Sequence, residues 1–119
     1  MVARLTTTIF VAALIRRVQA GGGFAYVARH GNDEAGTLFV AFHRAEDGRY
    51  DLFQPAPPDL SGARDTVAQA HMFVPGPSVS DALALRDFAE REARFDPDFW
   101  LVEIENWTEP VDALIALAS

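Results

Sequence analysis

The run LFVAF at residues 38–42 constrains the fold of this chain more than any other feature. Its five residues are all apolar, and they lie in a stretch, Thr37–Arg44, that has the composition of a β-strand. Side chains alternate between the two faces of a strand, so both faces of this strand are apolar. A sheet with one face in water would carry polar residues there. The pattern therefore predicts a sheet covered on both faces, by two helical layers or by a partner chain.

Two more segments have the composition of strands, Phe24–Arg29 and Arg49–Phe53. Turn-forming residues separate them from the central run, and this spacing predicts an antiparallel meander of three strands. A fourth strand is expected around Val67–Val74, where the Pro-Gly-Pro run at 75–77 would end it. Before it, Gln54–Gly62 is expected to form a surface loop, because its prolines and glycine oppose both a helix and a strand ladder.

A first helix is expected before the strands. Apolar residues recur at helical spacing from Phe10 to Val18, with Thr8 as the N-cap and Gly21 as the C-terminal stop. The uninterrupted apolar run is far shorter than the ~20 residues of a membrane span, and Arg16-Arg17 interrupts the similarity to a signal peptide. The segment therefore predicts an amphipathic helix instead of a signal peptide or a membrane span.

A second helix is expected from a Ser80 cap through Ala93. Pro97 disfavours helical backbone at the residue before it, so this helix must end by about Phe95. An aspartate before proline commonly bonds backbone amides in a turn, and this pattern assigns Asp96 a structural role.

The strand that follows has one wholly apolar face, which begins at Trp100. Its opposite face starts apolar and ends in Glu103 and Glu105, roughly 7 Å apart by strand rise. Close carboxylates push their pKa values apart, so this pair could hold a metal or act as acid and base. Pairing of an acidic strand end with arginines on a neighbouring element is far more common, and we adopt that interpretation.

Together the elements predict an α+β fold. It would be a small single domain over residues 1–119, with a mostly antiparallel sheet of about five strands packed with two or three helices. The third helix would be the apolar tail, Thr108–Ala118. A chain of 119 residues can form a hydrophobic core without metal or disulfide support, and it contains no cysteine.

The distribution of charge argues against nucleic acid as a partner. The formal net charge is −7, and residues 81–119 alone carry ten acidic residues against three arginines. Such an acidic C-terminal third repels phosphate backbones.

Few polar residues could form a site. Arg16 or Arg17 is expected to pair with carboxylates near the end of the second helix or on the last strand. The possible polar cluster consists of Arg16, Arg17, Asp96, Asp98, Glu103 and Glu105. No catalytic residue, metal site or cofactor is predicted, because no nucleophile or third ligand is fixed by spacing.

The loop His30–Gly36 offers one alternative. His30, Asp33 and Glu34 could ligate a metal, although three polar residues in a tight turn usually only shape the turn.

Several segments resemble the alphaproteobacterial domain-of-unknown-function family numbered 1491. They are REARFDPDFWLVEIEN, Phe10-Val11-x-Ala13-x-x-Arg16-Arg17, Glu34-Ala35-Gly36 and Leu52-Phe53-x-Pro55-Ala56-Pro57. The resemblance spans most of the chain, and the run RFDPDFW is its most specific part. It implies a small cytoplasmic bacterial protein, and it implies no activity, cofactor or catalytic residue.

Two functions from different classes fit these observations. The first is a non-enzymatic interaction module that binds a protein partner or forms a two-fold homodimer through the tail helix or an apolar sheet face. The second is a small enzyme or ligand-binding domain that uses arginine and glutamate residues around the last strand. A flat apolar patch would favour the first, and a pocket with converging charged groups would favour the second.

Overall fold

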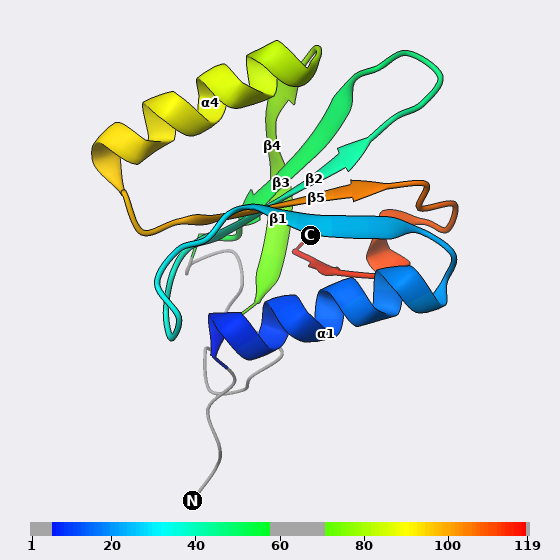
Figure 1. Ribbon diagram of the computed structural model, residues 1–119, viewed down its shortest axis with the longest axis horizontal. Coiled ribbons are helices and arrows are strands. Elements are labelled where there is room, and N and C mark those ends of the chain that lie inside the picture. Colours follow the sequence, from blue (N-terminus) through cyan, green and yellow to red (C-terminus); the bar gives the residue numbers. More distant parts are fainter. Residues whose placement is uncertain (1–5, 58–70, 119) are drawn as a thin grey trace, which may run out of the picture.

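The computed structural model describes residues 6–57 and 71–118. Figure 1 shows three layers: a sheet with helix α1 (Thr7–Ala20) on one face and helix α4 (Ala82–Phe95) on the other. The strands are β1 (Phe24–Arg29), β2 (Leu38–His43), β3 (Tyr50–Pro55), β4 (Met72–Val79), β5 (Trp100–Glu105) and β6 (Ala116–Leu117). The predicted α+β class and the cover on both faces of the sheet are confirmed.

The predicted three-strand meander is wrong at its first connection. The strand order is β1-β5-β2-β3-β4-β6, so β5 lies between β1 and β2. It runs antiparallel to β1 and parallel to β2, which makes the sheet mixed. Sequence neighbours were expected to pair, but β5 is apolar on both faces at its start, and such a strand is most stable in the interior of a sheet.

Strand β4 also differs from the prediction. It begins at Met72 and continues through the Pro-Gly-Pro run at 75–77, which was expected to end it. Because β6 pairs only with Met72 and Phe73, the prolines lie where one side of β4 has no neighbour in the sheet, and proline is tolerated there. Residues 67–70 of this predicted strand, and 58–62 of the predicted loop, lie outside the described residues.

The helix caps lie close to the predicted positions. Thr6, instead of Thr8, caps α1 and accepts a backbone N–H at 3.2 Å. Asp81, instead of Ser80, caps α4 at 2.8 Å. Gly21 follows the end of α1, as expected. In the two described ranges, neither helix has the length and apolar character required to cross a membrane.

The sheet divides the core into two clusters, and the alternation along β5 assigns its side chains to them as predicted. Towards α1 lie Val11, Leu14, Val18, Ala25, Leu38, Val40, Phe42, Phe53, Phe73, Trp100, Val102, Ile104, Leu114 and Ile115. Towards α4 lie Phe39, Ala41, Tyr50, Leu52, Val79, Leu85, Phe88, Phe99 and Leu101. Both faces of the central run LFVAF are therefore buried.

The tail does not form the expected helix. A short 3-10 turn at Val111–Ala113 leads into the two-residue strand β6. Leu114 and Ile115 are only 4% and 2% exposed, because they fill the core under α1. Arg17 holds the tail by donating to the carbonyls of Ala113 at 2.8 Å and Leu114 at 3.2 Å. These apolar residues pack on their own chain and are not a free surface for a second copy.

Candidate functional site

The hinge between α4 and β5 packs against the loop His30–Gly36. Asp96 Oδ1 accepts the backbone N–H of Asp98 at 3.0 Å, so the predicted contact of Asp96 with a backbone amide is present. Trp100 is 2% exposed, and its indole N–H donates to the carbonyl of Asn32 at 2.8 Å. The Asn32 N–H in turn donates to the carbonyl of Asp98 at 2.9 Å. These bonds join the hinge to the loop.

The same loop closes the N-terminal end of α1. Its carbonyls at Asp33 and Glu34 accept the first backbone N–H groups of the helix, at 3.0 and 3.1 Å. His30 Nε2 lies 3.3 Å from Asp33 Oδ1, and both side chains are mostly exposed. Within the described ranges, no three His, Cys, Asp or Glu residues lie close enough to hold a metal ion. The contacts of this loop support the interpretation of a shaped turn.

The structure does not bring the six predicted polar residues together. Arg17 lies on α1 and bonds the carbonyls of the tail, instead of the expected carboxylates. Arg16 is exposed on the same helix, and Asp98 is exposed at the hinge. Glu103 and Glu105 share a face of β5 beside β1, where they pair in register with residues of that strand.

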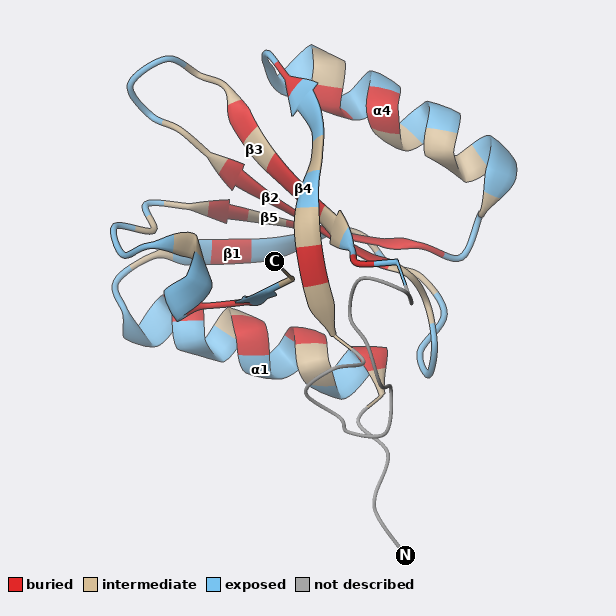
Figure 2. Cartoon of the chain, turned by 180° about the vertical axis from the view of Figure 1, so that it is seen from behind, coloured by how far each residue is buried: buried red, intermediate tan, exposed pale blue. Residues whose placement is uncertain are grey.

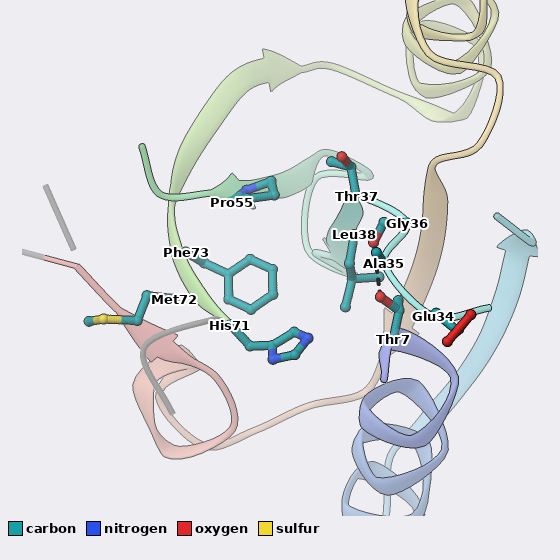
Figure 3. A pocket seen from close by; sticks show the side chains of 10 residues that line it. All are labelled: Thr7, Glu34, Ala35, Gly36, Thr37, Leu38, Pro55, His71, Met72 and Phe73. Carbon is teal, nitrogen blue, oxygen red and sulfur yellow. Dashed lines mark hydrogen bonds between the residues drawn. The ribbon is translucent and has the colours of Figure 1, made fainter. Parts of the chain in front are cut away.

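One cavity of about 260 Å³ opens beside the N-terminus of α1. Figure 3 shows its lining, and the Thr7 hydroxyl there is turned to the carbonyl of Gly36, to which it donates at 3.0 Å. The lining residues are Thr7, Glu34, Ala35, Gly36, Thr37, Leu38, Pro55, His71, Met72 and Phe73.

A larger space of about 410 Å³ lies between α4 and the sheet, and we call it the α4 groove. Its sheet wall comes from β1, β3 and β5, and its helix wall comes from the first half of α4. The lining residues are Tyr26, Ala28, Arg29, Tyr50, Ala82, Leu85, Arg86, Ala89, Leu101 and Glu103. Apolar and charged side chains therefore meet in one concave surface, as they do in many sites for small ligands.

The sheet wall of the α4 groove is an acidic and aromatic surface. Tyr26 and Glu103 are opposite each other in the β1–β5 ladder, and the Tyr26 hydroxyl donates to Glu103 Oε1 at 2.5 Å. Burial and this hydrogen bond raise the pKa of Tyr26 above its ordinary value. Burial, followed by the charges of Glu103 and Glu105, also raises the pKa of Tyr50. Both tyrosines therefore stay protonated at neutral pH.

Arginines lie on both walls of the α4 groove. Arg29 Nη2 donates to the carbonyl of Pro97 at 2.7 Å, and its guanidinium lies 4.6 Å from the centre of the Phe99 ring. Arg86, on the helix wall, is exposed and forms no ion pair or hydrogen bond with any residue that the structure describes.

Sequence reasoning found Glu103 but missed the other polar residues of the α4 groove. The alternation of side chains along β1 indicates which face of the strand Tyr26 occupies. No local pattern shows that β1 lies beside β5. Arg86 belongs to the polar side of an amphipathic helix, where an arginine usually needs no explanation. These side chains line one groove because of the order in which the strands pair. The spacing of residues along a single sequence does not show that order.

The outer edge of β1 is the second notable surface. In the described part of the chain, β1 pairs only with β5. Phe24, Tyr26 and Val27 are 51%, 38% and 36% exposed, so half of this six-residue strand consists of exposed large hydrophobic residues. Figure 2 shows β1 largely in the exposed colour. Edge strands usually carry lysine, proline or a bulge, and β1 has only a bulge near its end, after Val27.

The model of a family described as protein of unknown function (DUF1491) matches residues 5–110. The chain belongs to the DUF1491 family. The resemblance that the RFDPDFW run suggested is thus confirmed. No curated protein matches the chain.

Solved structures agree with this assignment over nearly the whole chain. A protein from A. tumefaciens, solved in solution, is 38% identical with a TM-score of 0.77, covering 97% of this chain and 95% of its own. A crystal structure of a DUF1491 protein from Caulobacter crescentus is 34% identical with a TM-score of 0.75, covering 98% and 100%. An NMR structure of a DUF1491 protein from the same organism is 36% identical with a TM-score of 0.75, covering 99% and 100%.

Proposed function

We propose that this DUF1491 protein is a non-enzymatic interaction module that self-associates, with β1 of one copy pairing with β1 of a second copy. The observation that supports the proposal is the open edge of β1 and its exposed Phe24, Tyr26 and Val27. The unpaired N–H and C=O groups of an edge strand form a template for another strand. The sheet faces are less suited to this role because α1 and α4 cover them.

A two-fold axis at Ala25 gives the most favourable pairing. Opposite residues of an antiparallel pair share a face, so Phe24 of one copy would lie opposite Tyr26 of the second. Aromatic pairs across strands stabilise such a ladder. The arrangement repeats on both sides of the axis and leaves no open β1 edge, which makes a closed dimer instead of a growing assembly.

The expected dimer is weak. The flat part of β1 ends at the bulge after Val27, so the ladder would involve only residues 23–27 of each copy. An interface of this length falls below the size of stable protein complexes, and a dissociation constant on the order of micromolar or weaker is expected.

Sedimentation equilibrium over a concentration series tests this proposal. With the axis at Ala25, Phe24→Glu places a carboxylate diagonally across the ladder from its symmetry-related copy, and like charges across a strand pair are destabilising. Val27→Glu replaces an exposed apolar side chain on the opposite face of β1, at the end of the ladder, by a charge. Both variants are expected to weaken the dimer at least about tenfold. Leu83→Glu is the matched control, because Leu83 is 62% exposed on α4, away from the β1 edge.

A monomer of 13.0 kDa at high micromolar concentration would refute the proposal. So would a dimer that Leu83→Glu weakens as much as the two β1 variants do. Circular dichroism of each variant distinguishes loss of association from loss of folding.

A further inference from the structure

Glu103 and Arg86 face the α4 groove from opposite walls and do not neutralise each other. No ion pair joins them in the described structure, and about 410 Å³ of space lies between the walls that carry them. That volume falls within the range of ordinary sites for small molecules. The groove is also lined by Leu85, Ala89 and Leu101. It therefore combines a carboxylate, a guanidinium without a partner among the described residues, and an apolar lining.

We propose that the α4 groove binds a free amino acid with an apolar side chain. The carboxylate of Glu103 binds the ammonium group of the ligand, and the guanidinium of Arg86 binds its carboxylate. The apolar side chain packs against Leu85, Ala89 and Leu101. Tyr26 belongs to both the groove and the proposed β1 interface, whereas Val27 does not line the groove, so a Val27 variant can separate ligand binding from self-association.

Tyr26 prepares Glu103 for the ammonium group. A tyrosine has one O–H to donate, and Tyr26 donates it to Oε1 of Glu103. This bond fixes the carboxylate and leaves Oε2 to accept from a ligand. The raised pKa of Tyr26 means that the hydroxyl keeps this proton at neutral pH. The ring of Tyr50 lines the same wall, and aromatic faces attract organic cations.

Arg86 is better placed than Arg29 to bind the carboxylate. The guanidinium of Arg29 already donates to the carbonyl of Pro97 and lies against the Phe99 ring. Arg86 has no such partner among the described residues, and its planar fork matches a carboxylate with two parallel hydrogen bonds. Glu103 on the sheet wall therefore binds the ammonium group of the ligand, and Arg86 on the helix wall binds its carboxylate.

The test is a titration followed by NMR chemical shifts of the backbone amides, with L-leucine as the probe. N-acetyl-L-leucine lacks the ammonium group, and L-leucinamide lacks the carboxylate, so the three compounds separate the two charges. The titration is run on the wild type and on Val27→Glu, which keeps it independent of the dimer. Leucine is expected to shift amides around Tyr26, Leu85 and Leu101, and each analogue is expected to bind at least about tenfold more weakly.

Matched variants assign the charges to residues. Glu103→Gln and Arg86→Gln are each expected to weaken leucine binding about tenfold while the unliganded spectrum stays folded. Arg91→Gln, on the same helix outside the groove lining, is expected to leave binding unchanged.

Three results would overturn the proposal. One is the absence of groove shifts at millimolar leucine. The second is binding of leucinamide as tight as that of leucine together with no effect of Arg86→Gln, which would reveal a site for cations only. The third is equal weakening by Arg91→Gln, which would indicate a nonspecific charge effect.

Discussion

At the scale of single residues, the RFDPDFW run packs against the loop His30–Gly36, which is distant from it in the sequence. Gly31 has no room for a side chain, because a Cβ there would lie 2.2 Å from the carbonyl oxygen of Asp98. A Cβ on Gly36 would lie 2.7 Å from the same oxygen, so Gly36 has no room for a side chain either. The local pattern predicted the turn at Asp96 and the burial of Trp100. It could not predict that the loop His30–Gly36 packs on both, because that contact joins residues 68 positions apart.

Truncation of the two hinge residues should have unequal effects. Trp100→Ala removes a buried indole and should cost ~3–5 kcal/mol, enough to unfold a domain of ordinary stability. Asp96→Ala removes one side-chain bond to a backbone amide and should cost about 1 kcal/mol, or a few degrees in melting temperature. Thermal melts with and without divalent cations measure both. A stable Asp96→Ala protein that has lost a heat-protecting effect of a cation would indicate a binding site instead of a hinge.

Tyr26 should make the protein less stable at alkaline pH. Burial and the hydrogen bond to Glu103 raise its pKa above 10.0 in the folded state, so the folded protein holds the proton more tightly than the unfolded chain does. Its contribution is complete below pH 10 and is lost as the pH rises above that value. Urea unfolding of Tyr26→Phe should therefore depend less on pH between about 9 and 11 than the wild type. Equal slopes for the two proteins would contradict the assignment.

At the scale of elements, the periodicity of apolar residues predicts which faces of helices and strands are buried, but it does not predict which strands pair. The alternation along β5 gave both of its faces correctly, and the apolar stripe of α1 gave its buried side. The apolar composition of the tail predicts a helix. Its burial under α1 and its short pairing with β4 determine its backbone instead. The same limitation concealed the α4 groove, which exists only because β5 separates β1 from β2.

Arg17 should stabilise the tail, and Arg16 should not. Both lie in the last half of α1, but Arg17 donates to two tail carbonyls, whereas Arg16 is exposed to solvent. Arg17→Ala should lower the free energy of unfolding by about 1 kcal/mol. Arg16→Ala should change it by less than about 0.5 kcal/mol. Urea unfolding of the pair checks this difference, and equal losses would show that helix propensity or net charge dominates.

At the scale of the whole molecule, the two-sided apolar run at 38–42 was sufficient to predict a sheet between two covering layers. Once α1 and α4 cover both faces, three of the four exposed large hydrophobic residues on the described strands lie on β1, and the fourth is Leu117 on β6. The order of the strands decides which strand occupies the edge of the sheet. The sequence has no local signal for that order, so neither the edge nor the groove beside it could be located before the structure.

Amide hydrogen exchange of β1 at two protein concentrations tests the proposed interface most directly. Alternate N–H groups of an edge strand point away from the sheet, and they exchange quickly unless another strand accepts them. The outward amides among residues 24–27 should become protected as the concentration rises from low to high micromolar, and Val27→Glu should abolish that protection. Fast exchange of these amides at every concentration would contradict pairing through β1.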